Sequence, residues 1–211
     1  MKQRPELLIA TRNQGKIREI KDALRFLPLQ LRYLSEFPAL GSVAEVGDTY
    51  EANAILKAEE YSKLSGVCTL ADDSGLEVDV LNGKPGVLSA RFAGECASDS
   101  ERIAKLLQAL RAHPDDKRTA RFVCSMAFVG WAPNTPRTRS PQVLQITKGR
   151  CDGRIAHAPR GENGFGFDPI FVPHGYDQTF GELGDEVKAG ISHRALALSA
   201  MQAFLERWLA T

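Results

Sequence analysis

Short apolar runs alternate along this chain with segments whose apolar residues recur at helical spacing. Residues 7–10 form the first run, and residues 17–27 follow with apolar side chains three or four positions apart, as along one face of a helix. The alanine-rich stretch 51–64 is also predicted to be helical and precedes a second apolar run at 67–71, while residues 120–129 form the strongest strand candidate. This alternation of strands and helices predicts an α/β fold with a mixed sheet.

The remaining elements follow from the same patterns and from capping signals. Further strands are expected at residues 29–34, 76–81, 142–155 (as one strand or two) and 167–172. Further helices are expected after the capping-box pair Ser98 and Glu101, ending before Pro114, and over residues 192–209. Gly66 suits the end of the helix 51–64, Asn82-Gly83 marks a turn, and the proline-containing segment 131–141 is predicted to be a loop.

Composition excludes several classes of protein. The chain has 211 residues, 43% hydrophobic and 25% charged, which is typical of a soluble globular protein with one large domain or two lobes on one sheet. A net charge of +1 gives no general attraction to nucleic acid or membrane. The apolar run near the N-terminus is too short for a signal peptide or membrane span, which favours a cytoplasmic protein. The four cysteines form no C-x-x-C pair, so zinc is not expected, and Cys68 and Cys124 are predicted to be buried free thiols.

Two adjacent carboxylates, Asp72 and Asp73, follow the run 67–71 and precede Ser74-Gly75. We predict that this run is a buried strand that delivers both carboxylates to the end of the sheet, where ligands of α/β proteins bind. Mg²⁺ prefers oxygen ligands and usually joins one or two carboxylates with substrate phosphates. Taken alone, these residues are interpreted equally well as an acidic turn between two strands.

The loop between the first strand and the first helix holds Thr11, Asn13 and Lys16. The first N–H groups of a helix have no partners within it, and the helix dipole favours an anion there. A hydroxyl, an amide and an ammonium beside those groups would form a phosphate cradle. The loop does not match the G-x-x-x-x-G-K-[ST] P-loop, and by itself it is better interpreted as a polar turn with a solvated lysine.

The helix 51–64 places Asn53 and Lys57 on one face, because they lie four residues apart. Asn53 stands beside alanines and needs a hydrogen-bond partner if it is buried. An exposed helix lysine is the better interpretation of Lys57 alone. Glu45, in a loop, is either a further metal ligand or a solvated carboxylate.

A glycine-rich segment, residues 161–169, surrounds Phe165, Phe167 and Asp168. Glycine lets a backbone approach a ligand closely, an aromatic ring can stack on a base, and a carboxylate can accept hydrogen bonds from base N–H groups. The alternative is a tight turn with phenylalanines in the core. That alternative is acceptable for Phe165 and for Phe171.

The last candidate residues lie around the start of the C-terminal helix. Lys188 precedes Ile191-Ser192-His193-Arg194, and His193 and Arg194 fall in the first turn of that helix. Cations there oppose the helix dipole, at a cost of roughly 0.3–1 kcal/mol. A role in binding would explain them, and a solvent-facing first turn is the alternative.

Together these segments resemble the inosine triphosphate pyrophosphatase family, the XTP/dITP diphosphatases of bacteria and eukaryotes. The resemblance runs nearly from end to end. The matching segments, in order, are Ala10-Thr11-Arg12-Asn13-Gln14-Gly15-Lys16, Thr49-Tyr50, Asn53-Ala54, Lys57-Ala58, Ala71-Asp72-Asp73-Ser74-Gly75-Leu76, Pro85-Gly86, Ser89-Ala90-Arg91, Gly164-Phe165-Gly166-Phe167-Asp168-Pro169 and Ile191-Ser192-His193-Arg194.

The resemblance implies a fold and a reaction. The fold is a single, elongated α/β domain over residues 1–211, with two lobes on a long mixed β-sheet and a central nucleotide-binding cleft, usually in a homodimer. The reaction converts a nucleoside triphosphate and water to the monophosphate and pyrophosphate, with Mg²⁺. The implied substrates are the deaminated purine nucleotides ITP, dITP, XTP and dXTP, removed before they enter DNA or RNA.

The resemblance also implies a role for each matching residue. Asp73 would be the catalytic carboxylate and a metal-site residue, joined there by Asp72 and Glu45. The substrate would be held by Thr11, Arg12, Asn13, Gln14, Gly15, Lys16, Lys57, Ser74, Phe165, Gly166, Phe167, Asp168, Lys188, His193 and Arg194.

The sequence departs from the family pattern before Asn53. The family often has glutamate at that place, where this chain has Ala52, with Glu51 one residue earlier. Two alternatives of another kind remain. One is a Maf-like nucleotide pyrophosphatase, against which the Phe-Gly-Phe-Asp and Ser-His-Arg segments argue. The other is a nucleotide-binding module without turnover, against which Asp72-Asp73 and Lys16 argue.

Overall fold

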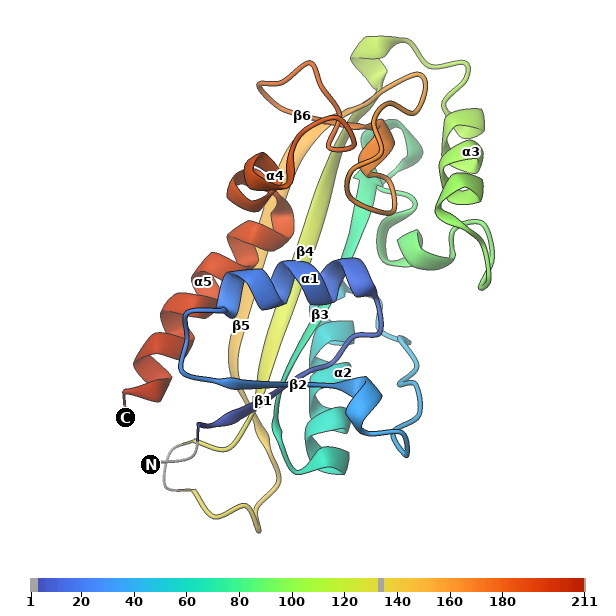
Figure 1. The fold of residues 1–211 in the computed structure, drawn as a ribbon. Coiled ribbons are helices and arrows are strands. Elements are labelled where there is room, and N and C mark those ends of the chain that lie inside the picture. The colour runs from blue at the N-terminus through green and yellow to red at the C-terminus, as the bar shows by residue number, and fades with distance from the viewer. Residues whose placement is uncertain (1–3, 133–134, 211) are drawn as a thin grey trace. The chain divides into compact units, whose positions relative to one another are not determined.

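The structure, a computed structural model, describes residues 4–132 and 135–210 (Figure 1). Its strands are β1 (Glu6–Ile9), β2 (Gln30–Tyr33), β3 (Cys68–Val78), β4 (Thr119–Gly130), β5 (Gln142–Ile155) and β6 (Phe171–Pro173). Its α-helices are α1 (Gln14–Leu24), α2 (Tyr50–Ser65), α3 (Asp99–Ala109), α4 (Asp185–Ile191) and α5 (His193–Leu209). None of the helices in the described ranges combines the length and apolarity that crossing a membrane requires.

The strands form one sheet in the order β2-β1-β3-β4-β5-β6. β1 lies parallel to both β2 and β3, while β6 runs antiparallel to β5. The predicted α/β fold with a mixed sheet is therefore confirmed. Parallel neighbours of β1 require crossover connections, and α1 and α2 supply helices within them.

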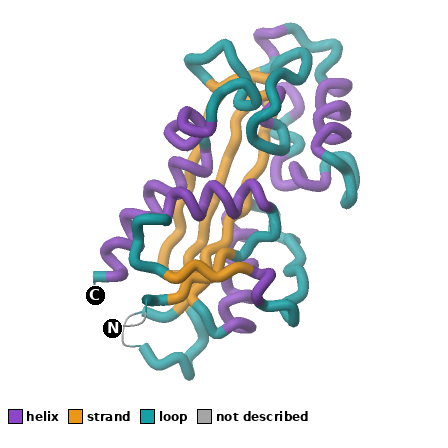
Figure 2. The backbone as a smooth tube through the Cα atoms, in the orientation of Figure 1, coloured by secondary structure: helices purple, strands orange, loops and turns teal. Residues whose placement is uncertain are grey.

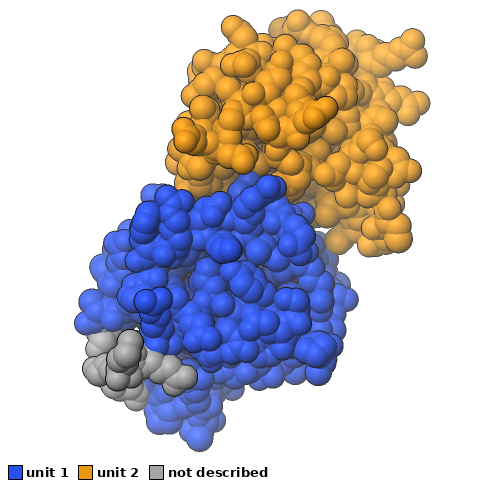
Figure 3. All heavy atoms as spheres, viewed as in Figure 1, with its two compact units in different colours: residues 1–73, 124–148, 197–211 blue, residues 74–123, 149–196 orange. Residues whose placement is uncertain are grey.

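The chain divides into two compact units, coloured separately in Figure 3. Unit 1 comprises residues 1–73, 124–148 and 197–211, and unit 2 comprises residues 74–123 and 149–196. The boundaries fall inside β3, β4, β5 and α5, so each of these elements contributes to both units.

Unit 1 has helices on both faces of its strands (Figure 2). Alternate strand residues point to opposite faces. Leu7 and Ile9 of β1 pack in one cluster with residues of α1 and α5, while Leu8 packs in another with Ala54 and Ala58 of α2. The residues of β3 share this alternation, which decides where its polar side chains point.

Unit 2 has a core of its own. Leu76 of β3 and Phe122 of β4 pack there with Ile103 and Leu106 of α3 and with Phe171 of β6. α3 begins with the predicted capping box, in which Ser98 and Glu101 each accept from the other's backbone N–H.

One correction concerns the strand that carries the paired carboxylates. Residues 67–71 and 76–81 were expected to be two strands with Asp72-Asp73 in a loop, but residues 68–78 form one continuous strand and 79–81 a 3₁₀ turn. Both aspartates are buried within β3, at 1% and 5% exposure. Carboxylates are poor strand residues, so the prediction of a turn followed their local preference, and the partners described below outweigh it.

Three other boundaries differ from expectation. α1 begins three residues early because the Asn13 side chain accepts from the Lys16 N–H and caps it. The expected strand 167–172 is mostly a 3₁₀ turn that contains Pro169, and β6 starts only at Phe171. α4 was not predicted, since its seven residues carry too short an apolar pattern.

Candidate active site

Asp73 is held in unit 1 by a buried amide. Asn53 of α2 is fully buried, and its Nδ2 donates to Asp73 Oδ2 over 3.0 Å. Its Oδ1 accepts from the Gly47 backbone N–H over 2.8 Å, so both ends of the amide are engaged. This arrangement supplies the partner that a buried asparagine requires and sets the orientation of the carboxylate.

Lys57 lies one helical turn after Asn53 and links three acidic residues. Its Nζ donates to Glu45 Oε1 over 2.5 Å and to the Asp72 carbonyl over 2.7 Å, and lies 3.9 Å from Asp73 Oδ1. Burial acts to lower the Lys57 pKa, but Asp72, Asp73 and Glu45 outweigh it and the pKa is raised. Lys57 is therefore a buried, protonated lysine.

Asp72 pairs instead with the first loop. Its Oδ2 lies 2.9 Å from Lys16 Nζ, at the start of α1. Consecutive strand residues point to opposite faces, so Asp72 faces α1 while Asp73 faces α2. The two carboxylates thus have different lysines as partners, although they are neighbours in the sequence.

The rest of the first loop surrounds the start of α1. Thr11 Oγ1 accepts from the Asn13 N–H, and Arg12 donates to the Leu40 carbonyl over 2.8 Å, so Arg12 ties the loop to another segment of unit 1. Gln14 is exposed, and Gly15 and Lys16 are half-buried. The predicted cradle residues are therefore grouped at one helix start, where unpaired N–H groups favour an anion.

Electrostatics make Asp73 an unusual carboxylate. Burial raises its pKa, Lys57 acts to lower it, the charge of Glu45 raises it further, and the net pKa lies above its ordinary value. A carboxylate with a raised pKa is a better proton acceptor than a free aspartate.

The acidic residues also suit a metal ion that arrives with phosphates. In the described ranges, no group of three or more His, Cys, Asp or Glu side chains is close enough to hold a metal by itself. Mg²⁺ usually takes only one or two carboxylates and completes its shell with phosphates and water. Asp73 and Glu45, which both lie beside Lys57, supply oxygen donors of the required kind and fit such a site, whereas the Asp72 side chain points to the other face of β3.

Unit 2 contains a second polar cluster, centred on Asp168. Its Oδ2 accepts from Lys188 Nζ over 2.6 Å and from the Phe165 N–H over 2.8 Å, with both charged side chains buried. The glycine-rich loop can close this tightly because Gly164 has a φ of +76° and no side chain, whereas a Cβ there would lie 2.1 Å from Asp168 Oδ2.

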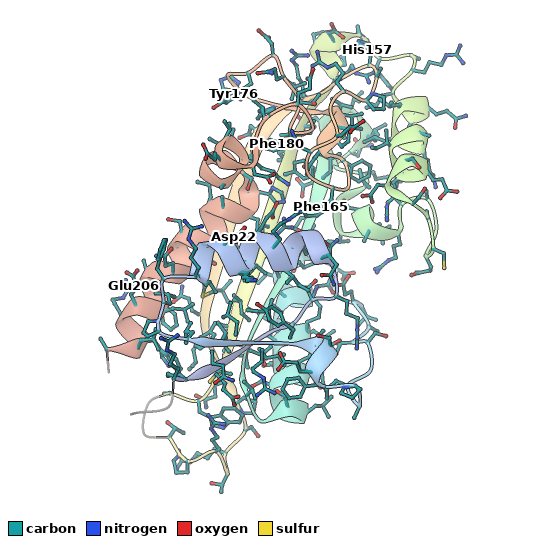
Figure 4. All side chains as sticks on the ribbon, viewed as in Figure 1. Asp22, His157, Phe165, Tyr176, Phe180 and Glu206 are labelled. Atoms are coloured by element: carbon teal, nitrogen blue, oxygen red, sulfur yellow. The ribbon has the colours of Figure 1, made fainter. Side chains whose placement is uncertain are left out.

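Phe165, labelled in Figure 4, is half-buried. The Lys188 ammonium is 4.6 Å and the Arg194 guanidinium carbon 5.5 Å from the centre of its ring. The alternative of a core phenylalanine is correct for Phe171 and Phe167, which are 0% and 4% exposed and pack in the core of unit 2, but not for Phe165. Phe167 was expected to bind substrate, and its side chain is taken up by that core.

His193 and Arg194 are buried, not solvent-facing. The His193 ring stacks on Phe122 with centroids 4.7 Å apart, and Arg194 is 2% exposed and donates to Ser74 Oγ over 2.8 Å. Ser74 follows Asp73 directly on β3. The residues expected to hold the base therefore all belong to unit 2, where Lys188 contacts Asp168 and Phe165, and Arg194 contacts Phe165.

Asn53 was missing from the predicted site residues, although it touches the candidate catalytic carboxylate. Its signal was present in the sequence as a polar residue among alanines on the face of Lys57. Asn53 also accounts for the glycine at position 47, because a Cβ there would lie 2.8 Å from Asn53 Oδ1.

Comparison with known proteins identifies the family of this chain. A model of the Ham1 family matches residues 7–204. The chain belongs to the Ham1 family. A curated family relative from Bacillus cereus, named dITP/XTP pyrophosphatase, is 43% identical over 208 residues, which are 99% of this chain and 98% of the relative.

Solved structures of Ham1 proteins have the same fold. The Coxiella burnetii protein superposes with a TM-score of 0.84 at 40% identity, covering 96% of this chain and 99% of that one. The Staphylococcus aureus protein gives a TM-score of 0.80 at 43% identity, covering 95% and 98%. The resemblance stated from the sequence is confirmed, and Ham1 membership decides against the Maf-like alternative.

Proposed function

We propose that this chain hydrolyses deaminated purine nucleoside triphosphates, among them dITP, ITP, XTP and dXTP, to the monophosphate and pyrophosphate. It is a nucleoside-triphosphate diphosphatase. Two clusters carry the proposal. In unit 1, Lys16 and Lys57 lie at the carboxylates of Asp72 and Asp73. In unit 2, Lys188 and Arg194 lie at the Phe165 ring, and Arg194 also donates to Ser74. The relatives' activity on dITP and XTP supports this choice of substrates.

The phosphates are assigned to the cluster in unit 1. Lys16 lies at the start of α1 and Lys57 lies on α2 beside the acidic groups. Both cations would stabilise the charge that develops on the leaving pyrophosphate. Asp73 would take the proton of the attacking water, since Asn53 orients its carboxylate and its pKa is raised.

Mg²⁺ is the proposed cofactor, with Asp73 and Glu45 as its candidate ligands; Asp72, the third expected ligand, faces Lys16 on the other side of β3. When bound, the ion would neutralise phosphate charge and make water a better nucleophile. Lys16 and Lys57 pair with the Asp72 and Glu45 carboxylates, and both lysines would be available to phosphate if those carboxylates were engaged elsewhere. A chelator should abolish turnover, and added Mg²⁺ should restore it.

The base is assigned to the cluster in unit 2. Hypoxanthine and xanthine present an acceptor at O6 and a donor at N1, and adenine reverses both. Arg194 and His193 are donors that match O6, and the exposed part of Phe165 offers a stacking surface. A site built on such hydrogen bonds can reject a mismatched analogue by about 10⁴–10⁵.

Pyrophosphate release from a panel of nucleotides tests the function. With Mg²⁺ present, dITP and XTP should be hydrolysed at least ~100-fold more efficiently than ATP and GTP. Equal kcat/KM for ATP or GTP would overturn the substrate assignment. Binding of dITP without pyrophosphate release would show a binding module instead of an enzyme.

Two properties of the family are proposed for this chain as well. A homodimer would give about twice the chain mass of 23.1 kDa in light scattering. A cytoplasmic location agrees with the composition and would be tested by fractionation of cells that express the protein.

A further inference from the structure

A buried serine on β4 stands out among apolar residues. Ser125 is 2% exposed, and its Oγ has no hydrogen-bond partner in the parts of the chain that are described. Its neighbours Cys124, Met126 and Ala127 all belong to hydrophobic core clusters. A buried hydroxyl without a partner opposes folding, so its presence calls for an explanation outside stability.

Side-chain contacts reveal the register between β3 and β4. In unit 1, a Cβ on Gly130 would lie 2.4 Å from Cys68 Sγ, so these two residues oppose each other. In unit 2, Arg121 Nε donates to Glu77 Oε2 over 2.8 Å. Residue numbers rise along β3 as they fall along β4, so the strands are antiparallel, and both pairs belong to a single register.

This register places Ser125 directly opposite Asp73. Just beyond the end of β3, the Thr119 hydroxyl donates to Asp79 over 2.8 Å, as the same register would place them. Agreement on both sides of the site leaves no extra residue in either strand between them. Directly opposed side chains have Cβ atoms roughly 4.5–5.5 Å apart, within reach of a hydroxyl and a carboxylate after rotation of one side chain.

Both side chains point to the face that α2 covers. Ala71 and Ala127 pack in the cluster that contains Ala54 and Ala58 of α2, and alternation carries Asp73 and Ser125 to the same face. Asn53 already donates to Asp73 Oδ2 from that side. Ser125 is thus a second donor, approaching the same carboxylate from the neighbouring strand.

We propose that Ser125 is a positioning residue for the reaction, whose hydroxyl donates to the Asp73 carboxylate when nucleotide is bound. The inference rests on the function proposed above. When phosphates compete for Lys57, Asp73 loses part of its cationic partner, and the two neutral donors, Asn53 and Ser125, keep its orientation. The partnerless hydroxyl is then a feature of the ligand-free protein, retained for catalysis at the expense of stability.

Three variants test the proposal: Ser125→Ala, Ser125→Cys and, as a control, Ser62→Ala. Ser125→Ala should lower kcat for dITP about tenfold, the factor for one hydrogen bond made in the transition state, with KM within about twofold of wild type. Ser125→Cys nearly preserves the volume but donates poorly, so it should be equally slow. The ligand-free Ser125→Ala protein should have an unchanged or higher Tm.

Ser62 is matched in burial and differs in bonding. It is fully buried on α2, and its hydroxyl donates to the Val67 carbonyl over 3.0 Å. Ser62→Ala should therefore lower Tm and leave kcat unchanged. Wild-type kcat in Ser125→Ala, recovery of kcat in Ser125→Cys, or a Tm loss in Ser125→Ala equal to that of Ser62→Ala would each overturn the proposal. If the wild type releases no pyrophosphate, the proposed function fails too.

Discussion

Asp73 combines burial with a dense set of polar neighbours, and these act on it in different ways. Asn53 directs one carboxylate oxygen, while Lys57 offsets the cost of burying the charge. Burial nevertheless keeps the pKa above the ordinary value. A buried charge is costly unless it is paired, and such an arrangement is found most often where chemistry takes place.

Replacing Asp73 with Asn separates chemistry from folding. The amide has the same shape but accepts no proton, so kcat for dITP should fall by about 10²–10⁴. The free energy of unfolding should not decrease by more than about 1 kcal/mol, because Glu45 and the Asp72 carbonyl still pair with Lys57. Pyrophosphate release and urea unfolding measure the two effects, and near wild-type kcat would show that Asp73 is not the catalytic carboxylate.

Lys188 gives a prediction about stability. Its partner Asp168 is buried, so Lys188→Met removes the ammonium from a buried carboxylate and should cost about 3–5 kcal/mol. The control is Lys63→Met, because Lys63 pairs with Glu60 at the exposed surface of α2, where a pair is worth at most about 1 kcal/mol. Urea unfolding at neutral pH compares them, and equal costs would show that the buried pair contributes nothing special.

At the scale of residues, the sequence identified the chemical groups better than their partners. Asp73, Lys16 and Lys57 became candidates through the resemblance, since the separate patterns favoured solvated lysines and left the aspartates open between a metal site and an acidic turn. Ser125 was not a candidate, because a single serine in an apolar strand carries no local signal, and its importance depends on the strand that pairs with it. Long-range pairing of this kind cannot be derived from one sequence without the register.

At the scale of elements, prediction succeeded where a periodic pattern or a cap was present. α2 and its end at Gly66, the capping box of α3 and the long strand β4 were all foreseen. β3 was divided wrongly, since two aspartates, a serine and a glycine have the local preferences of a turn. Cations and an amide from other elements, which stabilise these residues in a strand, are invisible to a local reading.

The end of α2 offers a test of one such signal. Gly66 has a φ of +68°, and no atom lies within 4 Å of the position that a Cβ would take there. Gly66→Ala should therefore cost about 1–2 kcal/mol from backbone conformation alone. Gly41→Ala is the control, because Gly41 is equally uncrowded but lacks a positive φ, and it should be neutral or slightly stabilising. Equal thermal unfolding of the two variants would contradict the capping role.

At the scale of the whole molecule, the two units each have a core, yet no linker in the sequence separates them. Their boundaries lie inside β3, β4, β5 and α5. A composition shift or a flexible tract marks domains joined end to end, and this chain has neither. The sequence could therefore predict a single α/β fold with two lobes only through resemblance to a family.

Thiol reactivity tests the burial pattern across both units. Cys96 is exposed, whereas Cys68, Cys124 and Cys151 are buried. Burial raises the pKa of Cys151 to about 11, so at pH 8 this thiol is almost entirely protonated, and its thiolate increases only as the pH rises further. A disulfide reagent at pH 8 should modify about one thiol per folded chain, at Cys96, and the others after unfolding. Rapid modification of Cys151 would contradict the packing of unit 2.

The continuity of β3 has a consequence for how this sequence can change in length. Removing or adding one residue between Cys68 and Val78 would exchange the two faces for everything beyond that point. Asp73 would then face α1, and Leu76 would leave the core of unit 2. We expect insertions and deletions to be tolerated in the connection between β4 and β5. Within the eleven residues of β3, we expect them to abolish activity. The number of residues in β3 is therefore as strictly constrained as their order.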